Sequence, residues 1–310
     1  SSLTPEQQKE FIIKDNVGFG EWDWELIANE WDAEQVTEWG LDIPDFRIEA
    51  EAQEDDYEIP DEIQTDIFLG DLFEIGPHRL LCGDSTQTDT FKALLGEQLA
   101  DLVVTDPPYN VNYKGSNGLK IQNDNMGDED FYQFLYDFYT ALGSYTKAGG
   151  AWYVWFADVE IVNFAKSFID SGLKLAQMII WEKNSLVMGR KDYHFIHEPC
   201  LYGWKEGAAH GWYSDRKQTT IIKMDRPQRN AEHPTMKPVP LIAYQIGNSS
   251  KQGDIVADGF GGSGTTMVAS HQMGRKCYMV EFDPKYCQVI VDRMRKLDPD
   301  IVIKRNGVEI

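Results

Sequence analysis

The sequence has few cysteines and no long hydrophobic run. Its 310 residues include four cysteines, and these show neither a CxxC pair nor the spacing of metal ligands: Cys82, Cys200, Cys277 and Cys287. Such cysteines predict reduced thiols in a cytoplasmic protein without a metal site. The longest apolar run, AWYVWFA at 151–157, is far shorter than the roughly 20 residues that cross a bilayer. We therefore expect neither a membrane span nor a secretory signal.

Basic residues are also scarce, with 29 Lys and Arg against 51 Asp and Glu, a net charge of −22. A uniformly acidic surface would repel a polyanion. However, residues 1–74 hold 23 acids and 3 bases, a net of −20, so residues 75–310 carry only −2. Residues 183–237 hold 10 bases and 6 acids, a local charge of +4. This distribution leaves nucleic acid open as a partner.

The hydrophobic pattern separates an acidic front from an α/β domain. Residues 1–44 have helical spacing, and Thr4, Pro5 and Gln7 form a helix-start pattern. Residues 45–66 are acidic and patternless, which predicts a linker. Over 67–310, short apolar strands alternate with helices, which predicts a mostly parallel sheet covered on both faces. We expect strands at 78–84, 101–106, 151–156, 173–183, 254–258 and 276–281, and helices at 88–96, 128–146, 158–171, 238–250, 264–273 and 284–297.

A glycine-rich turn, IVADGFGGSGTTMVA at 255–269, follows one predicted strand and opens a helix. Its glycines would let the backbone approach a ligand closely. Seventeen residues past Gly264 the next strand ends in Glu281, where an acid can accept hydrogen bonds from ribose hydroxyls. The pattern favours a nucleoside ligand, and a tight turn without a ligand is the alternative. No Gly-Lys-Ser/Thr follows, so this is not a phosphate loop.

A second turn, VVTDPPY at 103–109, ends an apolar strand on two prolines. Proline lacks the backbone N–H that a central strand needs, so the pair would form a rigid exit at the sheet's carboxyl edge. The Asp106 carboxylate and the Pro107 carbonyl would then be neighbouring acceptors beside the Tyr109 ring. This arrangement suits a planar amine whose ring stacks on the tyrosine. An incidental acid before a proline turn is the alternative.

Asp-Pro-Pro-Tyr followed about 150 residues later by the Phe260–Thr266 stretch FGGSGTT resembles the S-adenosylmethionine-dependent DNA amino-methyltransferases. The motif order is that of their β class, with the catalytic motif before the cofactor motif. The resemblance covers about residues 67–297 and implies a Rossmann-like fold with a circularly permuted motif order. Five further motifs occur in the family's order: LLCGDS (80–85), IIWEKN (179–184), HEPCLYGWK (197–205), HPTMKP (233–238) and EFDPKYC (281–287).

The resemblance implies a role for individual residues. The catalytic motif is Asp106, Pro107, Pro108 and Tyr109. Asp84 would face the cofactor adenine, although it could instead cap the next helix, and Lys237 would lie near the cofactor carboxylate, or else contact phosphate or be a solvated charge. The residues implied to hold S-adenosylmethionine are Asp84, Asp106, His233, Thr235, Lys237, Asp258, Phe260, Gly261, Gly262, Ser263, Gly264, Thr265, Glu281, Phe282 and Asp283.

Two features depart from the family pattern. The family usually has proline after the strand-end acid of the cofactor motif, whereas this chain has Gly259, which we expect to loosen the turn without removing a ligand group. The front segment resembles the tail of an N-terminal ParB-like domain that is fused to some methyltransferases of this kind. If so, most of that domain is absent from this sequence.

The implied partner is double-stranded DNA. We expect residues 184–232 to form a target-recognition insert, with 112–125 as a loop near the target base. A set of cations could contact phosphate, which would make binding salt-dependent, although each alone could be a solvated charge: Lys114, Arg190, Lys191, Arg216, Lys217, Arg226 and Arg229. A homodimer and a cognate restriction enzyme are further candidate partners, in a cytoplasmic, nucleoid-associated protein of a prokaryote or phage.

The implied reaction is methyl transfer to the N6 amine of a flipped adenine. Cytosine N4 is the alternative, although cytosine enzymes more often carry Ser at the Asp106 position. RNA or protein glutamine methylation uses related motifs, usually with Asn there. A non-catalytic ParB-like DNA-binding or regulatory protein is the alternative of another class, against which the intact motifs argue.

Overall fold

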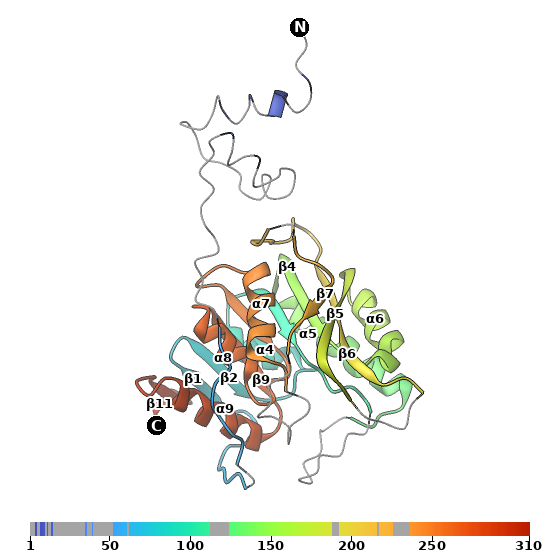
Figure 1. Cartoon of the computed structure of the whole chain (residues 1–310). Coiled ribbons are helices and arrows are strands. Elements are labelled where there is room, and N and C mark those ends of the chain that lie inside the picture. Colours follow the sequence, from blue (N-terminus) through green and yellow to red (C-terminus); the bar gives the residue numbers. More distant parts are fainter. Residues whose placement is uncertain are drawn as a thin grey trace.

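The computed structural model describes residues 52–60, 62–111, 124–187, 192–215, 217–225 and 236–310, with eight isolated positions before residue 40 (Figure 1). The helical unit predicted over 1–44 therefore lies largely outside the described residues. Its predicted start is confirmed, because Thr4 and Gln7 exchange hydrogen bonds. The Thr4 N–H donates to Gln7 Oε1 at 3.0 Å, and the Gln7 N–H donates to Thr4 Oγ1 at 3.2 Å.

The described strands form one 11-stranded sheet of order β11-β10-β1-β2-β9-β8-β3-β4-β6-β5-β7. The central run β2-β9-β8-β3-β4 is parallel throughout, and antiparallel strands flank it on both sides. The strands are β1 (Leu72–Ile75), β2 (His78–Cys82), β3 (Ala100–Thr105), β4 (Thr146–Trp155), β5 (Leu173–Val187), β6 (Phe195–Lys205), β7 (Ile221–Lys223), β8 (Ile255–Asp258), β9 (Lys276–Glu281), β10 (Ile303–Arg305) and β11 (Val308–Glu309).

Helices pack on both faces of the sheet (Figure 1). They are α4 (Thr88–Leu95), α5 (Asp128–Ser144), α6 (Ile161–Asp170), α7 (Val239–Ser249), α8 (Thr265–Gln272) and α9 (Pro284–Leu297), with a 3-10 turn at Asp158–Glu160. The predicted α/β architecture, with a mostly parallel central sheet and two covered faces, is confirmed. Strands β1, β6, β7, β10 and β11 were not predicted, because their sequences are short or interrupted by polar residues. Part of the predicted recognition insert forms β6, which pairs between β4 and β5.

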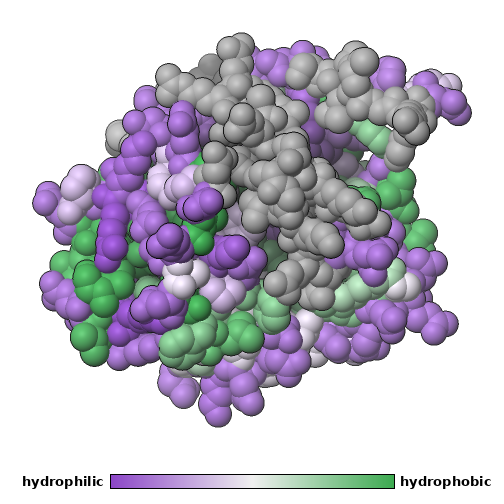
Figure 2. Space-filling model, turned by 90° about the horizontal axis from the view of Figure 1, so that it is seen from below, coloured by the Kyte–Doolittle hydropathy of each residue, from purple (hydrophilic) through white to green (hydrophobic). Residues whose placement is uncertain are grey.

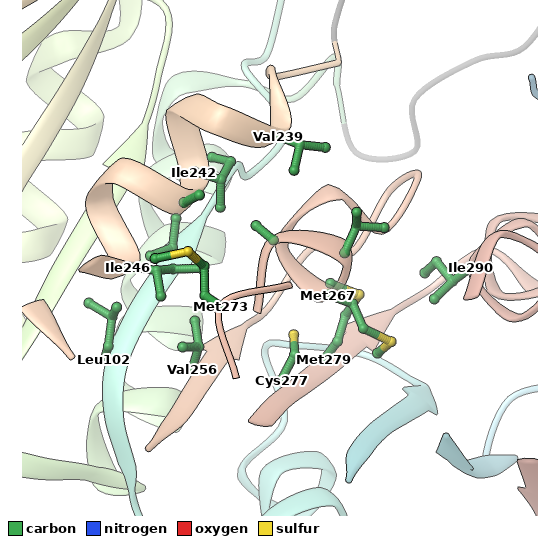
Figure 3. Close-up of a cluster of buried hydrophobic side chains, with 14 of the residues drawn as sticks. Leu102, Val239, Ile242, Ile246, Val256, Met267, Met273, Cys277, Met279 and Ile290 are labelled. Atoms are coloured by element: carbon green, nitrogen blue, oxygen red, sulfur yellow. The ribbon is translucent and has the colours of Figure 1, made fainter. Parts of the chain in front are cut away.

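Alternate residues of the central strands feed two separate cores. Leu102 and Val104 of β3 join side chains from α7, α8 and α9 on one face, while Val103 joins those from α4, α5 and α6 on the other. Figure 3 shows the first core, in which Ile242 and Ile246 of α7 lie with Leu102 and other strand residues. Since strand side chains alternate between faces, a strand buried on both sides reads as a continuous apolar run.

The acidic residues 52–60, which we call the acidic strap, lie against the α/β domain. Ala52 is buried in the core beneath α7, α8 and α9. The Val239 N–H at the start of α7 donates to Glu54 Oε1 at 2.8 Å. Asp55 forms an ion pair with Arg293 of α9 at 2.6 Å. The strap therefore connects two helices on one face of the sheet, in a region where the sequence predicts a linker.

On the face seen in Figure 2, the described residues are mostly hydrophilic, with hydrophobic residues in separate groups. Within the described residues, no helix combines the length and the hydrophobicity that a membrane crossing requires.

The turn after β8 packs directly on α5 at Gly259. A Cβ atom added there would lie 2.3 Å from Phe138 Cε2, so the ring occupies the space that any larger residue would need. The ring of Phe138 also contacts that of Phe260 edge-on, with centroids 4.7 Å apart. This packing explains why glycine, and not the family's usual proline, follows Asp258.

We expect Gly259→Ala to destabilise the protein by about 1–3 kcal/mol, because the new methyl group must displace Phe138 or the turn. Urea unfolding measures the difference. The matched control is Gly143→Ala in α5, where an added Cβ meets nothing within 4 Å and alanine favours the helix. Equal stability of Gly259→Ala and wild type would contradict this close packing.

Candidate active site

Four acidic residues meet at one edge of the parallel sheet. Asp106 follows β3 and Asp84 follows β2, while Asp258 ends β8 and Glu281 ends β9. The strand register places Cys82 opposite Glu281 and Asp258 opposite Met279, so the strands end at similar heights. The carboxyl edge is where open α/β sheets bind their ligands.

The Asp106-Pro107-Pro108-Tyr109 turn is held on its far side by Asn110. This residue has a φ of 58°, a left-handed conformation that asparagine tolerates better than most residues. Its side chain accepts from the Met126 N–H at 2.6 Å and donates to the Met126 carbonyl at 3.1 Å. The turn is thereby attached to Met126, which follows residues 112–123 in the sequence and lies just before α5.

A buried ammonium group organises the turn. Lys237, whose side chain is 5% exposed, donates to Asp106 Oδ2 at 2.7 Å and to the Tyr109 hydroxyl at 2.8 Å. It also forms an ion pair with Glu198 Oε2 of β6 at 3.0 Å, and the other oxygen of Glu198 accepts from Lys183 of β5. Positive and negative groups thus alternate from β5 through β6 to the catalytic turn.

The charges of Lys237, Asp106 and Glu198 influence one another's pKa. Burial raises the pKa of Asp106, and the neighbouring Lys237 offsets part of that rise. Burial alone would lower the pKa of Lys237, but Asp106 and Glu198 outweigh it and raise the pKa. Burial likewise opposes ionisation of Glu198, yet Lys237 and Lys183 lower its pKa overall. The Lys237 ammonium and the Glu198 carboxylate are therefore both charged near neutral pH.

One oxygen of Asp106 is still available as an acceptor. Asp106 Oδ1 is buried and accepts no hydrogen bond from any residue that the structure describes. A buried acceptor without a partner is costly and is uncommon in folded proteins. Because Lys237 holds Oδ2, the carboxylate presents Oδ1 in a defined orientation to a donor that enters the site.

The glycine-rich loop after β8 contains two residues in the left-handed region. Gly262 and Gly264 have φ values of 51° and 86°, which favour glycine. The Gly262 N–H donates to Glu281 Oε2 at 2.7 Å, and the Asp283 N–H donates to Glu281 Oε1 at 2.7 Å. Each carboxylate oxygen thus receives one backbone N–H and retains a lone pair for a hydroxyl donor. Burial raises the pKa of Glu281 to about 7.

Asp258 holds the loop to the neighbouring strand. Its Oδ1 accepts from Thr105 Oγ1 at 2.7 Å and from the Phe260 N–H at 3.0 Å. Burial raises the pKa of Asp258 to about 7. This carboxyl group therefore fixes the start of the glycine-rich loop against the end of β3, one residue before Asp106.

Other predicted cofactor residues lie around the same edge. Asp84 Oδ1 accepts from the Thr86 N–H at 2.9 Å and from Thr86 Oγ1 at 2.8 Å, whereas Gln87 occupies the N-cap position of α4. The alternative that Asp84 caps this helix is therefore wrong. Asp283 caps α9 by accepting from the Lys285 N–H, and Phe282 beside it is exposed.

Most of the predicted DNA contacts lie outside the described residues. Lys217 is described, and its backbone N–H donates to Asp215 Oδ1. The low exposure of Lys237 rules out a solvated surface charge. The predicted site residues that fall outside the described part of the chain are Lys114, Arg190, Lys191, Arg216, Arg226, Arg229, His233 and Thr235.

Several residues of the site had no role in the sequence-based prediction. Glu198 and Lys183 lie in the quoted HEPCLYGWK and IIWEKN motifs, so their positions were visible but their pairing was not. Asn110 follows the catalytic motif directly, and Asn is a residue that accepts a positive φ. Arg293 of α9 donates to the Ser263 carbonyl at 2.9 Å, and nothing in its local sequence indicates this contact.

The permuted parallel sheet, with a proline turn and a glycine-rich loop at adjacent strand ends, defines an α/β methyltransferase. Residues 100–292 match the N6_N4_Mtase family, described as DNA methylase, and the chain belongs to this family.

Named relatives agree with this assignment. Type II methyltransferase M2.DpnII of Streptococcus pneumoniae is 25% identical over 234 residues, which span 67% of this chain and 87% of the relative. Type II methyltransferase M2.LlaDCHI of Lactococcus lactis subsp. cremoris is 25% identical over 235 residues, with the same coverage.

Solved structures show the same fold. The PvuII DNA methyltransferase, named as cytosine-N4-specific, has a TM-score of 0.57 at 18% identity and covers 73% of this chain and 90% of its own. The complex of M1.HpyAVI with SAM has a TM-score of 0.53 at 22% identity and covers 69% of this chain and 98% of its own. At these identities the likeness concerns the fold.

We expect Lys237→Met to reduce methyl transfer by about 100-fold or more, because it leaves a buried carboxylate without its counter-charge. The pKa of Asp106 should rise further, so the remaining activity should increase with pH above neutrality as the carboxylate ionises. Initial rates across pH measure this. Lys166→Met removes an exposed lysine of α6 and should leave the profile unchanged. A Lys237→Met profile parallel to wild type would contradict the role of the ammonium.

The buried Asp258 should make stability depend on pH. A carboxyl group with a pKa of about 7 when folded and about 3.9 when unfolded favours folding in its protonated form. This stabilisation is lost as pH rises from about 4 through 7, by up to about 4 kcal/mol. Asp258→Asn keeps the acceptor oxygen, so its free energy of unfolding should fall less between about pH 5.5 and about pH 8.

Urea unfolding at both pH values measures this difference. The exposed Asp300, changed to Asn, serves as the control and should follow the wild type. If the free energy of unfolding changed equally between the two pH values for Asp258→Asn and wild type, Asp258 would be ionised at both pH values.

Proposed function

We propose that the chain transfers a methyl group from S-adenosylmethionine to the N6 amine of adenine in double-stranded DNA. The proposal rests on Asp106 Oδ1, which is buried and has no hydrogen-bond partner among the described residues, in a rigid turn at the carboxyl edge of the sheet. A planar exocyclic amine could donate one hydrogen to Oδ1 and the other to the Pro107 carbonyl. The family assignment supports DNA as the substrate.

The residues around the glycine-rich loop fit the proposed cofactor. Glu281 has one acceptor site left on each oxygen for the ribose hydroxyls, and Phe282 is exposed beside it. The loop from Phe260 to Thr265 would surround the methionine part, and Asp84 would face the adenine. When bound, S-adenosylmethionine supplies a methyl group that its sulfonium already activates. The structurally similar M1.HpyAVI was solved as a complex with SAM, which supports this choice.

The residues of this chain would make the amine a better nucleophile. Its lone pair is delocalised into the base, and hydrogen bonds to Asp106 and Pro107 would favour a pyramidal nitrogen that directs the lone pair at the methyl group. Lys237 orients the carboxylate by holding Oδ2, while Oδ1 has no donor among the described residues and would receive the amine. Because burial raises the pKa of Asp106, its carboxylate is also a better proton acceptor than an exposed aspartate. Positioning supplies much of the remaining acceleration.

A base inside a duplex cannot reach Asp106, so it must be flipped out. Flipping costs a few kcal/mol, which contacts in the pocket would offset. The Tyr109 ring would stack on the base, and its hydroxyl is fixed by Lys237. Residues 112–125 and the basic residues between Arg190 and Arg229 would contact the DNA. We propose that the enzyme acts on DNA in the cytoplasm. A cognate restriction enzyme is a further proposed partner.

Cytosine N4 is the second candidate, because the structurally similar PvuII enzyme is named as cytosine-N4-specific. Both amines could donate to the same two acceptors. We favour adenine because the resembling cytosine enzymes more often carry Ser where this chain has Asp106. The chemistry of the site supports amino methylation in either case.

Expression in a host without DNA methylation, followed by mass spectrometry of the hydrolysed DNA, identifies the product. We expect N6-methyladenine. N4-methylcytosine would contradict the choice of adenine but not amino methylation. Absence of both modified bases from DNA exposed to folded, cofactor-binding protein would contradict the proposed function.

The variant Asp106→Ala tests the catalytic turn. It should lose methyl transfer by about 10²–10³-fold or more, because the amine loses its principal acceptor, while calorimetry should still detect cofactor binding. Asp170→Ala, which removes an exposed acid of α6, is the matched control and should keep full activity. Substantial turnover by Asp106→Ala would contradict the catalytic role.

A further inference from the structure

The acidic strap reaches the glycine-rich loop through one buried arginine. Arg293 is 2% exposed, and two sides of its guanidinium face different parts of the chain. Its Nε and Nη2 donate to Asp55 Oδ2 and Oδ1 at 2.6 and 2.8 Å. Asp55 and Arg293 both lie outside residues 100–292, which match the family.

The third nitrogen of the guanidinium binds the loop. Arg293 Nη1 donates to the Ser263 carbonyl at 2.9 Å and lies 3.3 Å from both Ser263 Oγ and Thr265 Oγ1. These loop residues lie beside Gly262 and Gly264, which lack a Cβ atom and therefore allow the loop many backbone conformations. Contacts from the rigid, planar guanidinium group of Arg293 restrict the conformational freedom of the loop.

The two sets of contacts depend on each other. A buried guanidinium without a counter-charge is strongly disfavoured, so Arg293 would turn toward water or draw in solvent if Asp55 lost its charge. Either response would weaken the bonds from Nη1 to the loop. The side chain of Asp55 is 9% exposed, which keeps the pair shielded from solvent and salt.

We propose that Asp55 is a positioning residue for the cofactor loop, acting through Arg293 to hold Ser263 and Thr265 in the shape that receives S-adenosylmethionine. The acidic strap is then a part of the cofactor site and more than a connection to the front segment. Because this role depends on the proposed cofactor site, wild-type binding must be measured first.

The neighbouring Asp56 provides a matched control. It pairs with Lys296, another residue of α9, but Asp56 is 73% and Lys296 48% exposed. Exposed pairs of this kind contribute little to stability. Asp56→Asn therefore removes the same charge from the adjacent residue of the strap without affecting a buried partner.

The test is calorimetric titration of the full chain with S-adenosylmethionine. We expect Asp55→Asn to weaken binding by about 5- to 50-fold, while Asp56→Asn stays within about twofold of wild type. The KM for S-adenosylmethionine should rise in parallel for Asp55→Asn, with kcat at saturating cofactor little changed. Asp55→Glu, which keeps the charge, should recover most of the affinity.

A purely structural role would lower the melting temperature of Asp55→Asn and leave its cofactor affinity unchanged, and this result would overturn the proposal. If Asp55→Asn does not fold, Arg293→Lys keeps a positive charge for Asp55 but loses the planar fork to the loop. Folded Arg293→Lys with wild-type affinity would equally overturn the proposal. A wild-type protein that binds no S-adenosylmethionine would instead refute the cofactor site itself.

Discussion

The ion pairs and hydrogen bonds of the buried Lys237 ammonium are the interactions on which the Asp106–Tyr109 turn depends. It joins Asp106 and Tyr109 to Glu198 of β6, and Glu198 is in turn held by Lys183 of β5. A buried lysine without a carboxylate partner would tend to lose its charge. Two buried carboxylates without a cation between them would tend to take up protons. Together the Lys237 ammonium and the Glu198 carboxylate remain charged. Lys237 holds Asp106 Oδ2, while Oδ1 has no donor among the described residues. The antiparallel strands β5 and β6 are thereby linked through Lys237 to a turn that follows a strand of the parallel part of the sheet.

Arg293 has a comparable position on the other side of the site. It joins the acidic strap to the glycine-rich loop, as Lys237 joins β6 to the catalytic turn. Both cations are nearly inaccessible to solvent, and both bridge segments that are far apart in the sequence. Buried charges require well-oriented partners, so such bridges tolerate few alternative arrangements. In an acidic chain, two of the scarce basic residues are thus used for internal organisation.

The central sheet and the principal turns could be predicted from local pattern. The run at Leu102–Val104 is apolar because both faces of β3 are buried, and the double proline in the turn after it excludes a longer strand. Glycines at 262 and 264 adopt the left-handed conformations that such a turn requires. The sequence did not predict β6 as a sheet strand, because polar residues such as His197 and Glu198 interrupt its apolar pattern. It could not predict the placement of the acidic strap either, because the pairing of Asp55 with Arg293 spans more than half the chain.

The sequence by itself determined the fold class, the order of its motifs, and the acid, carbonyl and ring of the catalytic turn, since each depends on neighbouring residues and on their backbone preferences. Only the tertiary structure decided which charges meet. Lys237, assigned by resemblance to the cofactor carboxylate, contacts Asp106, and Asp55 contacts Arg293. Ion pairs between distant segments have no local pattern, because a charged side chain looks the same in a sequence whether it faces water or a buried partner.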